Sequence, residues 1–366
     1  MNYLLMNRDM PWLLFTLERN VFEEVECHEL SWFSGKHPYG YDSLADYLHW
    51  RQAPKHRKHI PELFSQYGCD NLEGFLNITH ALSLNDTFWV KPEDSGLCWA
   101  DVSLYRNPFD ELVSAAAFDG RPGGTSLSST SPEFGTDGYF AKCWVREGQD
   151  IFLYKCGSDT FEVEPLSEFL ATQVAERVCP EVVRYDLGFY HDRLVSKCRL
   201  FTSEQLGLVK AHDMLPQRER SISGILRRFE ELGFGDEFRR MCVLDALILN
   251  VDRHLGNFGV LVDNQTLQLQ RMAPVFDHNR SLLFDMDQAQ LENLPWCIGT
   301  CKPRIGTDFV ATARGMLTPE ICRDVEELRE FSFRQHRRFR RIRRDWMHWE
   351  QSSSHRPKEF WNNTAN

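Results

Sequence analysis

The chain has 366 residues, of which 42% are hydrophobic and 26% are charged, and its net charge at pH 7 is −11. This length supports a large core and predicts two or three packed units rather than one. The acidic balance argues against nucleic-acid binding by the surface as a whole. Apolar runs stay shorter than the roughly 18 residues of a membrane helix, so no membrane span is predicted.

Eleven cysteines are scattered along the chain, and none of them forms a CxxC pair. Cys297 and Cys301 have CxxxC spacing without a partner pair or a flanking histidine. The sequence therefore predicts neither a zinc site nor a disulfide framework, and reduced thiols indicate a cytoplasmic protein. The first residues lack a basic start and a small-residue cleavage site, so they do not read as a signal peptide.

In the first third of the chain, helices are expected over residues 43–51 and 61–67. Residues 118–138 are rich in Gly, Ser, Thr and Pro, which predicts a flexible loop or linker. Residues 139–145 and 150–157 then alternate like two strands joined by a turn.

The second half of the chain is predicted to be mainly helical. Pro165 lies early in a helical pattern over residues 166–178, and strand-like runs follow at 182–190 and 193–201. Helices are expected over residues 221–232 and 236–249, the second with Asp236 as its N-cap.

Polar residues in the order needed for phosphoryl transfer are spread over this framework. The reaction needs a loop over the phosphates, a strand lysine, an acid that fixes the lysine, an acid near the acceptor hydroxyl, and metal ligands. The chain offers, in this order, residues 126–138, Lys155 in FLYKCG, Glu168 in the next helix, Asp252 and Asn257 in NVDRHLGNFG, and Asp277 in APVFDH.

The spacing from Asp252 to Asn257 allows both side chains to point to one side of a tight loop. Gly256 permits the turn, and Gly259 permits a bend before the next strand. The segments FGVLV and LQLQR, joined by DNQT, are predicted to form a hairpin that leads to Asp277. Amide and carboxylate oxygens together suit Mg²⁺.

These motifs resemble those of the HipA-like kinases. NVDRHLGNFG with MAPVFDHNRSL resembles the catalytic and metal-binding motifs, above all those of the stand-alone bacterial type with DRHxxNFG, and the phosphatidylinositol kinases share DRHxxN. FLYKCG with EPLSEFLATQVAERV resembles the strand lysine and glutamate helix. SPEFGTDGYFAKCW resembles the phosphate loop, although GxGxxG is missing. SLNDTFWVKPED resembles the segment ahead of the kinase core.

The resemblance implies an α+β, two-lobed, protein-kinase-like fold with a small β-rich N-lobe and a helical C-lobe. The N-lobe would span residues 120–205 and the C-lobe residues 206–366, and residues 1–119 would pack on this core. The implied activity is that of an ATP- and Mg²⁺-dependent serine/threonine kinase that phosphorylates itself, within residues 126–136, and a protein substrate.

The same resemblance implies a role for each site residue. Asp252 would orient or deprotonate the acceptor hydroxyl, and Asn257 and Asp277 would hold Mg²⁺. His254 would either take part in proton transfer or brace the loop. The residue after Asp277 is His278 rather than glycine, so this segment need not flip as it does in ordinary protein kinases. The expected nucleotide contacts are Lys155 held by Glu168, the phosphate-loop residues Gly135, Thr136 and Gly138, and a hinge at residues 196–201 that includes Lys197, Cys198 and Phe201.

Other interpretations remain open from the residues alone. Asp252 could be a turn residue, Lys155 a solvated strand lysine, Glu168 a surface glutamate, and the Ser/Thr cluster plain linker. A lipid or small-molecule kinase on the same fold, or a catalytically silent binding module, are alternative functions. The presence of the full set of polar residues speaks against the silent module.

An arginine-rich segment lies near the end of the sequence. Residues 334–344 include seven arginines and no acid. Aromatic and aliphatic residues around them share one helical face, which predicts a terminal helix docked by that face. An acidic partner, an anionic membrane surface or RNA are the alternatives for its basic side.

The family also implies an antitoxin-type partner, or a role as a secreted effector.

Overall fold

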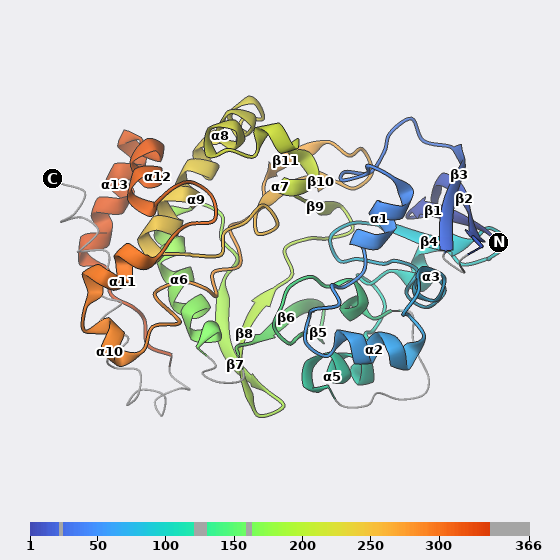
Figure 1. The fold of residues 1–366 in the computed structure, drawn as a ribbon, viewed down its shortest axis with the longest axis horizontal. Coiled ribbons are helices and arrows are strands. Elements are labelled where there is room, and N and C mark those ends of the chain that lie inside the picture. The colour runs from blue at the N-terminus through green and yellow to red at the C-terminus, as the bar shows by residue number, and fades with distance from the viewer. Residues whose placement is uncertain (22–24, 121–129, 159–162, 337–366) are drawn as a thin grey trace. The chain divides into compact units, whose positions relative to one another are not determined.

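Two compact units make up this computed structural model (Figure 1), which describes residues 1–21, 25–120, 130–158 and 163–336. Unit 1 comprises Met1–Cys156, Arg199–Val209 and Val260–Gln270. Unit 2 comprises Gly157–Cys198, Lys210–Gly259 and the described residues from Arg271 onward. Unit 1 carries most of the strands and unit 2 the longest helices, which confirms the predicted α+β class. The domain boundaries expected near residues 119 and 205 stay a prediction.

The described ranges contain no helix with the length and apolar character needed to cross a membrane. All eleven cysteines lie in the described ranges, and none of them forms a disulfide bond there. The arginine-rich helix expected near the end of the sequence lies, from residue 337 on, outside the described residues.

Unit 1 begins with a four-stranded antiparallel sheet in the order β3-β2-β1-β4. Its strands are β1 (Asn2–Asn7), β2 (Met10–Arg19), β3 (Val25–Trp32) and β4 (Phe88–Pro92). The sequence predicts none of the first three strands, because β1 and β2 bury residues on both faces and therefore lack a clean alternation of apolar and polar residues.

Short helices complete the core of unit 1. Both predicted helices are confirmed as α1 (Leu44–Trp50), capped by the Ser43 hydroxyl, and α2 (Ile60–Tyr67). The other helical segments are α3 (Leu72–Thr79), α4 (Trp99–Val102), α5 (Glu111–Asp119) and the 3₁₀ turn η1 (Pro132–Gly135).

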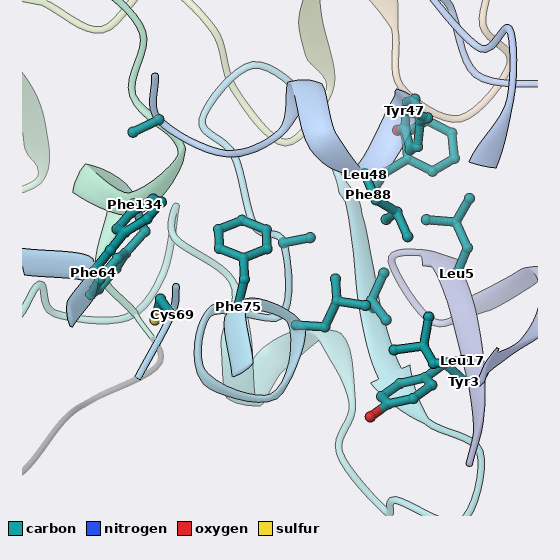
Figure 2. Close-up of a cluster of buried hydrophobic side chains, with 14 of the residues drawn as sticks. Tyr3, Leu5, Leu17, Tyr47, Leu48, Phe64, Cys69, Phe75, Phe88 and Phe134 are labelled. Carbon is teal, nitrogen blue, oxygen red and sulfur yellow. The ribbon is translucent and has the colours of Figure 1, made fainter. Parts of the chain in front are cut away.

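Many buried side chains of the sheet and helices gather in an apolar cluster (Figure 2). Tyr3 and Phe15 lie opposite each other in the register of β1 and β2, and their rings stack at 5.6 Å. Phe64 of α2 stacks on Phe134 of η1 at 6.0 Å. The second contact attaches the segment after residue 130 to the helical part of this core.

Two further strand groups involve unit 1. The predicted hairpin is confirmed as β5 (Lys142–Glu147) and β6 (Asp150–Cys156), with Gly148 at positive φ in the turn. A three-stranded sheet has the order β11-β10-β9, from β9 (Leu206–Lys210), β10 (Gly259–Asp263) and β11 (Leu269–Met272). Its β10 and β11 are the two strands predicted on either side of DNQT.

Unit 2 is built around two long helices, α6 (Glu164–Val178) and α9 (Gly235–Ile248), which pack on each other (Figure 1). The predicted strands are confirmed as the antiparallel hairpin β7 (Tyr185–Tyr190) and β8 (Arg193–Arg199). The expected N-cap of α9 was wrong: the helix is capped at Phe234, and Asp236 lies in its first turn and pairs with Arg240.

The remaining elements of unit 2 are shorter. The helix predicted over residues 221–232 is confirmed as α8 (Ile222–Glu231). Helix α12 (Phe309–Met316) packs against α9. The other helical segments are α7 (Ala211–Met214), η2 (Gln217–Glu219), α10 (Gln288–Leu291), α11 (Leu294–Thr300), α13 (Pro319–Glu327) and η3 (Leu328–Glu330).

A buried arginine ties α1 to the segment that leads into β4. Arg51 binds both carboxylate oxygens of Asp86, at 2.8 and 3.0 Å, and donates to the carbonyl oxygens of Ala81 and Phe88. The fork geometry of a guanidinium satisfies all of these acceptors at once.

We expect Arg51→Met to lower the free energy of unfolding by about 3 kcal/mol, since it leaves a half-buried carboxylate and buried carbonyls without their donor. Arg19→Met is the control, because the side chain of Arg19 in its pair with Glu73 is 55% exposed and such pairs contribute less than about 1 kcal/mol. Denaturant titration measures both. Equal midpoints for the two variants would contradict the structural role of Arg51.

Candidate functional site

The candidate site in unit 2 begins where helix α9 ends. Leu249 has a left-handed conformation, φ +51°, and its N–H caps the helix on the Asp245 carbonyl. The Asn250 side chain then connects the helix with the loop. Its Nδ2 donates to Asp245 Oδ1 at 3.1 Å, and its Oδ1 accepts from the Asp252 N–H at 3.0 Å. These bonds fix the turn that presents Asp252.

Arg253 lies at the centre of the loop and is 2% exposed. Its Nε is 3.0 Å from Asp245 Oδ2, on α9, and its Nη2 is 3.1 Å from Asp245 Oδ1. Burial opposes the charge of Arg253, but the Asp245 carboxylate outweighs this effect. The pKa of Arg253 is therefore raised, and the guanidinium is a permanent cation. The sequence pattern does not single out this residue, because an arginine in a polar loop is usually a surface residue.

One nitrogen of Arg253 joins the two segments that carry the expected metal ligands. Its Nη1 donates to the carbonyl oxygen of Asn257 at 2.7 Å and to that of Phe276 at 2.5 Å. Phe276 immediately precedes Asp277. The structure therefore brings Asn257 and Asp277 into neighbouring positions, as the sequence predicts.

The Asn257 side chain is oriented with its nitrogen toward the loop. Asn257 is buried, and its Nδ2 donates to the Asp252 carbonyl at 3.0 Å. Among the described residues, none donates a hydrogen bond to its Oδ1. That oxygen therefore keeps its lone pairs for a ligand.

Asp277 adopts a left-handed conformation, φ +61°, which an aspartate tolerates better than most residues. Its backbone N–H donates to the hydroxyl oxygen of Tyr185, on β7, at 3.1 Å. Burial raises the pKa of Tyr185 well above its ordinary value, and the nearby Glu168 and Asp277 carboxylates raise it further. The phenol is therefore neutral and holds the Asp277 backbone in place.

Glu168, on α6, is fully buried, so the alternative of a surface helix glutamate is wrong. The Ser196 hydroxyl donates to its Oε2 at 2.5 Å, and the backbone N–H of His278 approaches Oε1 at 3.4 Å. Glu168 thus connects α6 and β8 with the segment that follows Asp277. Lys155 belongs to unit 1, so the expected contact between Lys155 and Glu168 stays a prediction.

His254 and Asp252 lie on the accessible side of the loop. The Nδ1 of His254 accepts the N–H of Gly256 at 3.0 Å, a contact that braces the turn. The expected choice between bracing and proton transfer stays a prediction. The Asp252 carboxylate is 3.1 Å from Nε of Arg304, and the side chain of Asp252 is 21% exposed. Asp252 is therefore a partly accessible carboxylate with a cationic neighbour.

In unit 1, Lys155 has a partner that sequence reasoning missed. Lys142 lies directly opposite Lys155 in the register of β5 and β6, so both side chains lie on one face of the hairpin, and both are buried. Gly138 has φ +108°, and a Cβ at this position would lie 2.0 Å from Nζ of Lys142. The ammonium of Lys142 therefore lies against the backbone of the expected phosphate loop.

Arg57 holds the second half of that loop and the start of β5. Its Nη1 donates to the carbonyl oxygens of Glu133 and Thr136 at 3.1 and 2.9 Å, and its Nη2 donates to that of Lys142 at 2.7 Å. Burial lowers the pKa of Arg57 to about 10, against the opposing effect of the Glu133 carboxylate. Arg57 therefore stays protonated at neutral pH.

The other phosphate-loop residues contact their own unit. Gly135 lies so close to the carbonyl of Leu82 that a Cβ would come within 2.9 Å of it, and the Thr136 hydroxyl donates to the Pro132 carbonyl. Of the expected autophosphorylation segment, residues 126–129 lie outside the described residues. Thr130 and Ser131 are buried.

The expected hinge begins inside β8, which contains Lys197 and the buried Cys198, whereas Phe201 follows the strand. Ser196 uses its hydroxyl for Glu168, as described above. The adenine contacts expected of this segment stay a prediction.

Chemically, the assembled residues of unit 2 offer one amide oxygen and nearby carboxylates but no cage of protein ligands. In the described ranges, no three His, Cys, Asp or Glu side chains gather where they could hold a metal ion by themselves. A cation with few protein ligands, completed by phosphate oxygens and waters, is the coordination that suits Mg²⁺.

Comparison of the sequence with known proteins gives a partial relative. No protein-family model matches the sequence. The serine/threonine-protein kinase CtkA of Helicobacter pylori is 29% identical over 125 residues, which are 30% of this chain and 38% of CtkA. The match therefore spans less than two fifths of the length of that relative.

The solved structures that are similar to this one include HipA and CtkA. HipA of Shewanella oneidensis MR-1, solved in a toxin–antitoxin complex with HipB and operator DNA, matches with a TM-score of 0.53 and 11% identity over 98% of this chain and 97% of HipA. The H. pylori proinflammatory kinase CtkA matches with a TM-score of 0.44 and 16% identity over 61% of this chain and 92% of CtkA. The match to HipA includes nearly the whole of both chains. The chain thus has the fold seen in HipA, which confirms the fold that the resemblance implies.

Proposed function

We propose that this protein transfers the γ-phosphoryl group of ATP to a serine or threonine hydroxyl of a protein substrate, with Mg²⁺ as cofactor. The observation that carries the proposal is the double hydrogen bond of Arg253 Nη1, which brings the segments of Asn257 and Asp277 together next to Asp252. Phosphoryl transfer depends mainly on such positioning. The partial sequence relative CtkA is a serine/threonine-protein kinase, which supports the same reaction.

In this proposal Asn257 Oδ1 and the Asp277 carboxylate hold the Mg²⁺, whose charge would offset that of the phosphates. Asp252 orients the acceptor hydroxyl and accepts its proton. Lys155 and Lys142 bind phosphate oxygens from their shared face of the β5–β6 hairpin. Glu168 orients the segment after Asp277.

The similar HipA of S. oneidensis belongs to a toxin–antitoxin system and was solved together with HipB. By analogy of fold, we propose that this protein also has a protein partner of the antitoxin type. Co-purification of the full chain with proteins of its own cell, followed by mass spectrometry, tests this part of the proposal.

Asp277→Asn should weaken Mg²⁺-dependent ATP binding and abolish transfer, because a charged ligand is lost from a site that must offset a triphosphate. Asparagine also tolerates the left-handed backbone of this position, so the fold should be unaffected. Calorimetric titration with MgATP, and with ATP in the presence of a chelator, measures the effect. Unchanged MgATP affinity would exclude Asp277 as a metal ligand.

Asp252→Asn should keep MgATP affinity within a few-fold and lower transfer by roughly 10²-fold or more, the scale expected of a positioned acid–base group. Label transfer from ATP, followed by mapping of the phosphorylated residue, measures it. A variant with full transfer would refute the proposed role, and full transfer by both aspartate variants would refute the kinase itself.

Lys142→Met should raise the dissociation constant of ATP by about tenfold, because an ammonium that binds a phosphate contributes on the order of 1.5 kcal/mol. Methionine preserves the length of the buried side chain. Lys55→Met, at an exposed position of the same unit, is the control and should leave the constant unchanged. If both variants bind ATP equally well, Lys142 is a structural lysine only.

A further inference from the structure

A pocket of about 540 Å³ opens beside the loop that carries Asp252, and all of its walls belong to unit 2. It is lined by residues 220–222, which lead into α8, by His254 and Leu255 of the loop, and by residues 304–307. None of these described lining residues is acidic. The functions assigned above to the site do not use this pocket.

Arg220 brings to the pocket a positive charge that pairs with no carboxylate of the described residues. Its Nε donates to the Leu215 carbonyl and its Nη2 to the His212 carbonyl, both at 3.2 Å. Within the described part of the chain, Arg220 has no carboxylate partner. The side chain is therefore held in place while its positive charge faces an accessible pocket.

The start of helix α8 adds to the same positive field. Ser221 caps the helix by accepting the Gly224 N–H at 3.2 Å, and Ser221 and Ile222 line the pocket. The first turn of α8 contains no acidic residue. The partial positive charge of this helix end is therefore not offset locally.

Arg304 is the second arginine of the pocket, and it also contacts the proposed catalytic acid. Its Nε lies 3.1 Å from Asp252 Oδ1, whereas its side chain is 54% exposed. Gly306 forms the adjacent turn at φ +93°, so close to Thr312 of α12 that a Cβ would come within 2.3 Å of its Oγ1. The turn thus fixes the position of the Arg304 backbone. The exposed side chain of Arg304 can reach either Asp252 or a ligand in the pocket.

We propose that this pocket binds an acidic side chain of the protein substrate, next to the hydroxyl that receives the phosphoryl group. The inference rests on the proposed function, since it uses the role of Asp252. In the free protein, Arg304 holds the Asp252 carboxylate. An incoming carboxylate, bound by Arg220 and the start of α8, draws Arg304 away, and Asp252 becomes available to the acceptor hydroxyl.

The dimensions of the pocket favour a side chain over a nucleic acid. Nucleic-acid surfaces are extended basic stripes that contact successive phosphates. Here the two arginines face one small pocket, and the protein carries a net charge of −11. A single carboxylate can be bound by both arginines through charge-assisted hydrogen bonds.

Binding is tested on the full chain with two fluorescent peptides, one with a serine flanked on each side by glutamates and the other by glutamines. Fluorescence anisotropy should give about tenfold tighter binding of the glutamate peptide. Arg220→Gln and Arg304→Gln should each reduce this preference several-fold. Arg218→Gln is the control, because Arg218 is 85% exposed and does not line the pocket, and it should keep the preference.

Equal binding of the two peptides by the unmodified protein would overturn the proposal. So would an equal loss of preference in Arg218→Gln and Arg220→Gln, which would indicate general surface charge. Displacement of the glutamate peptide by a single-stranded RNA at lower concentrations than by unlabelled peptide would assign the pocket to nucleic acid instead.

Transfer to the same peptides separates this inference from the proposed function. Arg220→Gln should raise KM for the glutamate peptide more than it lowers kcat. Arg304→Gln should raise kcat for the glutamine peptide, because Asp252 is no longer held. Transfer without a preference for glutamate refutes the inference alone, whereas a binding preference without transfer to either peptide refutes the proposed function alone.

Discussion

The buried guanidinium of Arg253 is the interaction on which the site in unit 2 depends. It connects the Asp245 carboxylate of α9 with the backbone of the loop and with the segment before Asp277. A charge buried this deeply needs hydrogen-bond acceptors around it to offset the loss of water. The acceptors that the buried Arg253 guanidinium requires include the backbone carbonyls next to the expected ligands. This requirement therefore determines where Asn257 and Asp277 lie.

A second buried guanidinium does the same for the loop in unit 1. Arg57 binds three carbonyl oxygens between Glu133 and Lys142, and so the glycine-containing loop keeps a defined shape without a GxGxxG pattern. Both arginines act on backbone carbonyls rather than on a substrate. Each unit thus uses one interior cation to position a loop that carries the proposed chemistry.

Much of this arrangement could be predicted from the sequence, and the parts that could not have physical reasons. The β5–β6 hairpin, α6, α8 and the grouping of Asn257 with Asp277 follow from local periodicity and spacing. Strands β1 and β2 were not predicted because their residues are buried on both faces. The structural roles of Arg57 and Arg253 were not predicted because a sequence does not distinguish a buried arginine from a solvated one. The role of Lys142 was not predicted because only the strand register pairs it with Lys155.

The residue after Asp277 has a consequence for how such an enzyme could be controlled. His278 is fully buried, its Nδ1 is 3.2 Å from Nη2 of Arg253, and its backbone faces Glu168. Kinases with glycine at this position can rotate the aspartate out of the site and so exist in an inactive form. A segment locked on both sides by interior charges has no such freedom. If the protein is the kinase proposed above, its regulation would have to act on the entry of its substrates, because the segment that carries the proposed metal ligand Asp277 is held in place.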